Sequence, residues 1–188
     1  MSTSSRALIT SFATDLVDAC LACPEIAHTI VVSPDADALA LAQSLGADAI
    51  QEDTESGINE AVQQGRTTAD SAVIAILGDT PCITSEVLST VLREAGKHTV
   101  AFVPDASGVG STMWCVQPGV NDTSHFGHHS RAKHRAAGAV ELGVGESSHL
   151  WARARRDVDT DVDLWDAQRL GVGAHTLALL TTTDNPHD

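Results

Sequence analysis

Two acidic segments carry the side chains best suited to hold a metal ion. The first is Gly78-Asp79-Thr80-Pro81, which follows residues 72–77, the most apolar run of the chain. If that run is a buried strand of a parallel sheet, Asp79 lies at the carboxyl edge, where such sheets bind ligands. A carboxylate there can hold a divalent cation against substrate phosphates, and the alternative is that Asp79 only caps the turn.

The second acidic segment is Arg156-Asp157-Val158-Asp159-Thr160-Asp161. In an extended segment alternate residues project to one side, so its three aspartates can converge on one cation. An EF-hand loop is excluded, because the glycine and glutamate needed at its sixth and twelfth positions are absent. A phosphatase nucleophile of the DxDxT type normally follows the first strand of its domain, whereas this segment lies near the C-terminus. What remains is a metal-binding pair or a charged N-cap for the next helix, with Asp161 the favoured cap.

Residues 126–135 form the only basic cluster that is followed by a helix, and they include Lys133, one of two lysines. Free N–H groups at a helix start together with local cations favour an anion site. A zinc site and a solvated basic face are the alternatives. The histidines of this region are His125, His128, His129 and His134.

A polar helix start is expected at Gly57-Ile58-Asn59. The Asn59 side chain offers both a donor and an acceptor, so it can read a base edge or a ribose hydroxyl, or it is an ordinary first-turn residue. No Walker A lysine motif and no dinucleotide fingerprint occur in the sequence.

Strands alternating with helices must position these side chains. We expect strands at 29–32, 47–50, 72–77, 99–103, 112–116 and 152–158, and helices at 7–22, after Asp35 or Asp37 as far as Gly46, at 58–64, after Pro81, and at 130–137, 161–170 and 174–181. This alternation predicts an α/β fold with a mostly parallel sheet covered on both faces. Because the 72–77 run lacks alternation, we expect it to be buried on both faces.

The composition narrows the classes of function. A chain of 188 residues with 43% hydrophobic residues predicts one domain, 1–183, with a frayed tail at 184–188. The net charge of −14 disfavours nucleic acid and anionic membranes as partners. We expect no membrane-spanning helix and no secretory signal, and the four cysteines fit a reduced, cytoplasmic protein, with Cys20 and Cys23 packed in the interior.

Several short motifs occur in a specific order over nearly the whole chain. They are Val31-Val32-Ser33-Pro34-Asp35, Leu45-Gly46-Ala47-Asp48, Gly57-Ile58-Asn59-Glu60-Ala61, Gly78-Asp79-Thr80-Pro81, Gly110-Ser111-Thr112, Phe126-Gly127 with Ser130 and His134-Arg135, and Asp157-Val158-Asp159-Thr160 with Asp163-Leu164. In this order they resemble the CofC/FbiD family of guanylyltransferases from the biosynthesis of the deazaflavin coenzyme F-420.

The resemblance implies a nucleotidyltransferase-like (Rossmann-like) three-layer sandwich and a reaction of GTP with a three-carbon phospho-acid that releases pyrophosphate. The acceptor expected is phosphoenolpyruvate, with 2-phospho-L-lactate as the alternative, and the downstream transferase of the pathway is a possible protein partner. The implied site residues are Asp79 and Asp157 for catalysis and Mg²⁺, with Asp159 nearby, Thr112, Gly127 and Ser130 for the phospho-acid, and Gly57 and Asn59 for the guanosine.

The chain departs from the family at its start. Family members begin with a strand and a loop carrying Lys and Arg, which faces the triphosphate, whereas this chain starts in the helix that follows. Arg6 belongs to that helix and is a poor substitute. We therefore expect the 188-residue form to bind GTP weakly, to be inactive and only marginally soluble, with an unpaired sheet edge. The alternative from another class is a non-catalytic nucleotide-binding relic or fragment.

Overall fold

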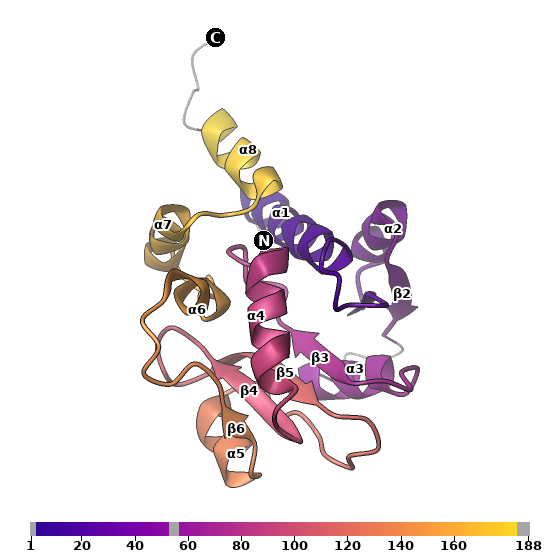
Figure 1. The fold of residues 1–188 in the computed structure, drawn as a ribbon. Coiled ribbons are helices and arrows are strands. Elements are labelled where there is room, and N and C mark those ends of the chain that lie inside the picture. The colour runs from indigo at the N-terminus through magenta and orange to yellow at the C-terminus, as the bar shows by residue number, and fades with distance from the viewer. Residues whose placement is uncertain (1–2, 53–56, 184–188) are drawn as a thin grey trace.

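The computed structural model describes residues 3–52 and 57–183 of the chain (Figure 1). The helices are α1 (Thr3–Leu21), α2 (Ala36–Leu45), α3 (Ile58–Arg66), α4 (Ser85–Ala95), α5 (Ser130–Ala136), α6 (His149–Ala154), α7 (Asp161–Leu170) and α8 (Ala174–Thr183). The strands are β1 (Ile30–Ser33), β2 (Asp48–Gln51), β3 (Val73–Ile76), β4 (Val100–Pro104), β5 (Ser111–Val116) and β6 (Val140–Glu141). The expected 184–188 tail lies outside the described residues. None of the helices in the described ranges is both long and apolar enough to cross a membrane.

The strands form two sheets. In the smaller sheet β1 pairs in parallel with β2, and the larger sheet has the order β3-β5-β4-β6. The expected α/β class is confirmed, and the sheet is partly mixed: β4 and β6 are parallel, while β5 is antiparallel to both β3 and β4. The short loop 105–110 explains the β4–β5 pairing, because a parallel pair needs a much longer crossover connection.

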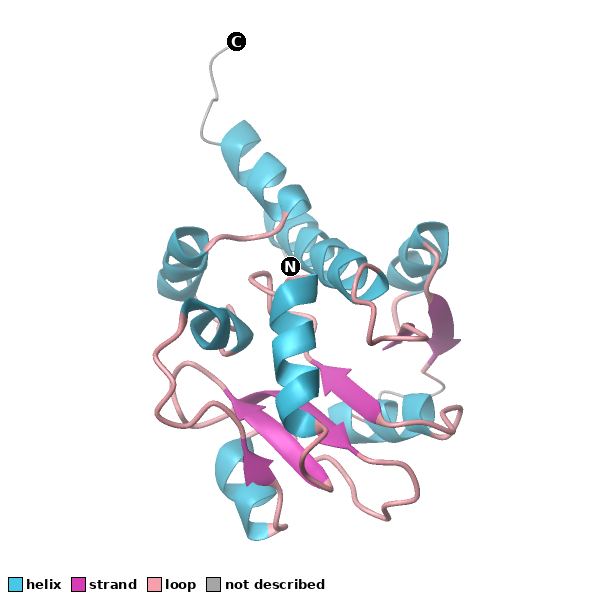
Figure 2. Ribbon diagram, in the orientation of Figure 1, coloured by secondary structure: helices cyan, strands magenta, loops and turns pink. Residues whose placement is uncertain are grey.

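Helices cover both faces of the larger sheet, and Figures 1 and 2 show α4 lying across its front. Residues of β5 alternate between the two faces. Met113 and Cys115 pack in the cluster with Val87 and Leu88 of α4, while Trp114 packs in a second cluster on the other face, together with Val62 of α3 and Phe126. The period-two pattern of a strand thus gives both faces of the sheet an apolar layer.

Strand β3 is less buried than its sequence predicts. Each of its four residues is only partly buried, so the expectation that it is buried on both faces is wrong. The reason is its position: within the described residues β3 pairs with β5 on one edge only, and β1 likewise pairs only with β2. An edge strand keeps part of its side-chain surface exposed.

Residues 152–158 do not form the expected strand. The first of them belong to α6, and an extended segment follows. Leu150, Trp151 and Ala154 are spaced to lie on one helical face, and this face packs in the main core cluster with residues of α4. Because that packing holds the helix, the chain becomes extended only after Ala154.

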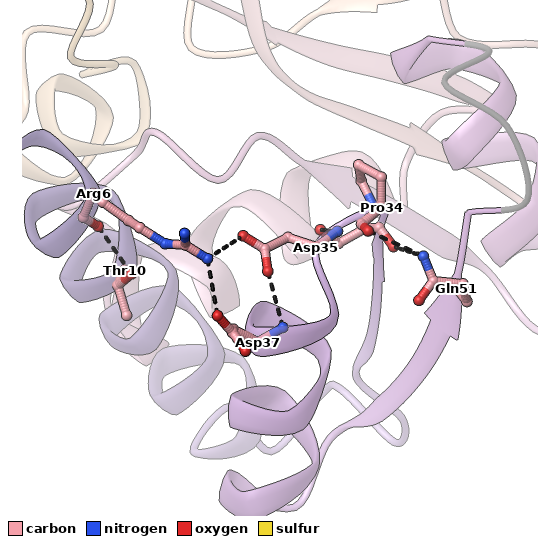
Figure 3. Close-up of polar contacts among 7 residues, drawn as sticks. Arg6, Thr10, Pro34, Asp35, Asp37 and Gln51 are labelled. Carbon is pink, nitrogen blue, oxygen red and sulfur yellow. Dashed lines mark hydrogen bonds and ion pairs between the residues drawn. The ribbon is translucent and has the colours of Figure 1, made fainter. Parts of the chain in front are cut away.

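Arg6 joins α1 to the start of α2 (Figure 3). Its guanidinium lies 3.0 Å from carboxylate oxygens of both Asp35 and Asp37. Asp35 is the N-cap of α2, and its side chain accepts a hydrogen bond from the Asp37 N–H at 2.9 Å. The cation of Arg6 is therefore already paired with two carboxylates.

Candidate active site

Asp79 and Asp157 come together at the end of strand β3. The Asp79 carbonyl accepts a hydrogen bond of 3.0 Å from the Val158 N–H, and this bond joins the extended segment after α6 to the turn after β3. Oδ1 of Asp79 is buried and has no hydrogen-bond partner among the described residues. Two acidic segments about eighty residues apart in the sequence thus meet at the edge that the sequence predicts.

The pKa values of Asp79 and Asp157 are both raised, first by burial and then by neighbouring carboxylates. Burial raises the pKa of Asp79 above its usual range, and the charge of Asp159 adds to this shift. The pKa of Asp157 is raised to about 6, first by burial and then by the charges of Asp105, Asp79 and Asp159. A buried, unpartnered carboxylate oxygen beside further uncompensated negative charge is the environment that a divalent cation stabilises.

The geometry fits a cation held by two carboxylates rather than by three. In the ranges that the structure describes, no group of three His, Cys, Asp or Glu side chains lies close enough to share a metal ion. Asp159 is exposed, and Asp161 is the first residue of α7. Mg²⁺ commonly takes one or two protein carboxylates and completes its shell with water and substrate phosphates, so two carboxylates such as Asp79 and Asp157 would be enough to hold it.

The N-cap of α7 is Thr160 and not Asp161, so that prediction is wrong. The Thr160 side chain accepts from the Asp163 N–H, and the Asp163 carboxylate accepts from the Thr160 N–H at 3.0 Å, which is a reciprocal capping box. Arg156 pairs with Asp163 and Asp166. The capping box stabilises the turn that immediately follows the acidic segment.

Asn59 of α3 is hydrogen-bonded to the loop before α5. The Asn59 amide of α3 donates to the Phe126 carbonyl at 3.1 Å, and its Oδ1 accepts from the Phe126 N–H at 2.8 Å and from the Ser124 hydroxyl at 2.9 Å. The side chain that the sequence suggests for guanosine therefore holds the chain just before Gly127. Gly57, which precedes α3, is exposed and has a φ of 107°, so a side chain there is disfavoured.

Ser111, Ser130 and His134 form a buried hydrogen-bonded cluster. Ser111 Oγ lies 2.8 Å from Ser130 Oγ and 3.2 Å from His134 Nδ1, and Nε2 of the imidazole accepts from the His125 N–H at 2.9 Å. The backbone before it is unusual at His129, a non-glycine residue with a φ of 55°, whereas Gly127 adopts its φ of 103° without strain. Left-handed conformations of non-glycine residues concentrate at functional sites and persist where the surrounding contacts hold them.

Thr112 lies beside this cluster, but its hydroxyl points to a different partner. Thr112 is fully buried, and its hydroxyl donates to the Ala154 carbonyl at 2.8 Å. The bond ties β5 to the end of α6, three residues before Asp157. Thr112 therefore connects the serine cluster to the acidic pair.

The positive charge of the basic cluster at residues 126–135 is partly neutralised by Glu141. Arg131 donates to the Gly108 carbonyl at 2.9 Å and to Glu141 at 2.7 Å, and Arg135 lies 3.8 Å from the same carboxylate. The four nearby histidines do not assemble a three-ligand metal group within the described residues.

The site residues that sequence reasoning missed are Ser111 and Asp105. Asp105 directly follows β4, so the strand-end rule that selected Asp79 also points to it.

Comparison with known proteins agrees with this architecture. A crystal structure from Desulfovibrio desulfuricans G20, assigned as a nucleotide-diphospho-sugar transferase, superimposes with a TM-score of 0.64 at 18% sequence identity, covering 96% of this chain and 84% of that one. The fold is thus that of the nucleotidyltransferase-like α/β proteins.

The family follows from the sequence match. The family model described as "Guanylyl transferase CofC like" matches residues 1–181, and the chain belongs to this family. The phosphoenolpyruvate guanylyltransferase of Streptomyces coelicolor is 40% identical over 177 residues, which cover 92% of this chain and 82% of that protein. Proteins of the same name from Thermomonospora curvata and Salinispora arenicola are 39% and 38% identical, covering 93% and 96% of this chain and 77% and 83% of theirs.

Proposed function

We propose that the chain is a phosphoenolpyruvate guanylyltransferase, which joins GTP to phosphoenolpyruvate and releases pyrophosphate. The names of its relatives support this activity. The structural observation that carries it is the meeting of Asp79, which has a buried carboxylate oxygen without a hydrogen-bond partner among the described residues, with the partly buried Asp157. The hydrogen bond from Thr112 to the Ala154 carbonyl links this place to the buried Ser111–Ser130–His134 cluster. A site for two anionic substrates needs both a cation and neutral donors.

The reaction is an in-line displacement at phosphorus. A phosphate oxygen of phosphoenolpyruvate attacks the α-phosphorus of GTP, a P–O bond forms, and the bond to the bridging oxygen of the β-phosphate breaks, so that pyrophosphate leaves. In this proposal Asp79 and Asp157 would hold Mg²⁺, with Asp159 nearby, and a bound Mg²⁺ would supply positive charge against the negative charge that develops on the phosphates. The protein contributes mainly position and electrostatics, because it is not asked to form a covalent bond.

The phospho-acid is assigned to the loop before α5. Ser130 supplies a hydroxyl, and Gly127 allows the backbone to approach the ligand closely because it carries no side chain. Thr112 serves the same pocket by tying β5 to the end of α6, since its hydroxyl is engaged with the Ala154 carbonyl. On the nucleotide side, Gly57 lines the guanosine pocket with its backbone. Asn59, which the family resemblance also assigns to guanosine, holds the loop of the phospho-acid pocket through its hydrogen bonds to Phe126.

The activity is tested by mass spectrometry and pyrophosphate release. The chain is incubated with GTP and Mg²⁺, and with either phosphoenolpyruvate or 2-phospho-L-lactate. A chimera that adds, at the N-terminus, the residues of the Streptomyces coelicolor relative that precede the matching region is tested in parallel. We expect the enolpyruvyl-diphospho-guanosine product from the chimera, and the parallel measurement on the 188-residue form shows whether the added residues are needed for turnover.

Two variants of the chimera identify the metal site. Asp79→Asn is expected to abolish turnover, while Asp159→Asn, at an exposed carboxylate, is expected to have the smaller effect. A folded chimera that forms no product with either acid contradicts the proposed function. Near-normal GTP consumption by the Asp79→Asn variant contradicts the metal assignment alone.

A further inference from the structure

A backbone group sets the tautomer of His134 in the Ser111–Ser130–His134 cluster. His134 is fully buried, and its ring lies between Phe102 and Phe126 at centroid distances of 5.1 and 5.5 Å. The His125 N–H donates to Nε2 at 2.9 Å, and a backbone N–H is always a donor. Nε2 must therefore present its lone pair, so the proton of the neutral imidazole is on Nδ1.

Burial supports the neutral form of this imidazole. It lowers the pKa of His134 to about 4, with a further contribution from His125. The ring is thus a fixed tautomer with Nδ1–H aimed at Ser111 Oγ, 3.2 Å away.

Counting hydrogens shows what the cluster lacks. It holds three polar hydrogens, one on Nδ1 and one on each serine hydroxyl, but only two contacts within the cluster to receive them. Within the described part of the chain, neither hydroxyl makes another hydrogen bond. One hydroxyl hydrogen therefore has no acceptor, in surroundings where Ser130 is 1% and Ser111 is 5% exposed. With the opposite tautomer, all hydroxyl hydrogens would be used inside the cluster and none would remain.

We propose that His134 and Ser111 are positioning residues which turn the Ser130 hydroxyl hydrogen toward an oxyanion of the phospho-acid. The proposal rests on the proposed function, because it assigns the spare donor to that substrate. Nδ1–H donates to Ser111, Ser111 donates to Ser130, and Ser130 donates to a ligand oxygen that can only accept. A phosphate or carboxylate oxygen of the ligand fits this donor, because it only accepts hydrogen bonds and carries negative charge. A ligand hydroxyl would bind less tightly, because its own hydrogen would have no acceptor in the cluster.

The location agrees with this role. Ser130 is the first residue of α5, directly after the loop with positive φ at Gly127 and His129. The preceding residues are held from two sides, by His134 at the His125 N–H and by Asn59 at Phe126. The imidazole thus fixes both the loop and the direction of the hydroxyl.

The tautomer is tested directly by ¹⁵N NMR of the histidine ring in the 188-residue protein without ligand. We expect His134 to show a protonated Nδ1 and an unprotonated Nε2 at neutral pH. A protonated Nε2 overturns the proposal, whatever the activity of the protein.

The effect on binding is measured by calorimetry with phosphoenolpyruvate and with inorganic phosphate, and GTP is the reference ligand. Ser111→Ala is expected to weaken phosphoenolpyruvate binding by about tenfold, because a hydrogen bond to a charged group loses its direction, while GTP binding is unchanged. Ser11→Ala is the matched control, since Ser11 is a similarly buried serine in α1 that donates to the Leu8 carbonyl. Equal effects of the two variants overturn the proposal in favour of a structural cluster.

Substitution of the imidazole gives a rescue experiment. His134→Asn keeps an N–H donor at the position of Nδ1, whereas His134→Leu removes it. We expect the asparagine variant to bind phosphoenolpyruvate more tightly than the leucine variant at equal thermal stability, and equal affinities overturn the relay. If the variants lose affinity for phosphoenolpyruvate only, Ser130 is assigned to the carboxylate of this ligand. If they lose affinity for inorganic phosphate equally, Ser130 is assigned to the phosphate group. If the wild-type protein binds neither, this proposal fails, while the turnover assay of the chimera still judges the proposed function.

Discussion

Replacing Asn59 tests whether this residue reads the nucleotide or holds the loop of the acceptor pocket. The Asn59→Ala variant removes three hydrogen bonds, two to the Phe126 backbone and one to the Ser124 hydroxyl. Both Phe126 and Ser124 are buried at 4% exposure, so water does not freely replace the lost partner.

The expected cost follows from the number of bonds. A neutral hydrogen bond contributes about 0.5–1.5 kcal/mol, and a buried group left without a partner costs about 1–3 kcal/mol. Three such bonds, with partial access of water to Asn59, give a loss of about 3 kcal/mol in the free energy of unfolding. Asn59→Asp keeps the two accepted bonds but sets a carboxylate oxygen against the Phe126 carbonyl, so we expect roughly half of that loss.

The assay combines urea unfolding with steady-state kinetics, both measured on the chimera described above. We expect a lower denaturation midpoint for Asn59→Ala and a KM that rises for phosphoenolpyruvate more than for GTP. Asn121→Ala, at an exposed asparagine on the same connection, is the control and should leave both unchanged. A midpoint equal to that of the control, with a KM increase confined to GTP, would show that the amide binds guanosine and would refute the reasoning.

Two further predictions concern charge. The folded-state pKa of Asp157 is about 6, above its ordinary 3.8, so the carboxyl contributes stability below pH 3.8 that is lost as the pH rises through 6. In buffer with EDTA, the melting temperature of Asp157→Asn should therefore rise relative to that of the wild type between about pH 4 and pH 6. Mg²⁺ should reduce this difference in melting temperature. A difference that stays constant across this pH range contradicts the assigned burial of Asp157. Arg6→Ala should lower the free energy of unfolding by less than about 1 kcal/mol, because Arg6, Asp35 and Asp37 are all exposed, and a loss of several kcal/mol in chemical denaturation would contradict this.

Sequence patterns predicted most elements because these depend on local signals. The helix that ends at Gly46 needs a residue with positive φ at that position, which has a φ of 103°, and glycine adopts it without strain. The helix with Val87, Leu88 and Val91 has an apolar face that packs in the main core as the spacing predicts. The segment at 152–158 was mistaken for a strand, because it is short and its helical face becomes visible only once α4 lies against it.

The residues of the candidate site also fall into two groups, those that the sequence predicts and those whose role only the fold shows. The sequence by itself determined the acidic strand end at Asp79 and the family, because residue type and order along the chain carry both. It could not assign Asn59, Thr112 or Thr160, since each side chain is committed to a partner that the residue type does not name. A donor or acceptor binds whatever group the fold brings within about 3 Å.

The direction of the serine cluster was decided only by the tertiary structure. Ser111 and Ser130 are nineteen residues apart, and they meet where the first turn of α5 is joined to the loop before β5 by the hydrogen bond from the Arg131 N–H to the Val109 carbonyl. The tautomer of His134 is set by a backbone N–H nine residues away. No pattern of residue types records that contact. The sequence supplies the titratable and hydroxyl groups, and the fold decides which of them has a hydrogen to give, because hydrogen bonding depends on distance and direction in space.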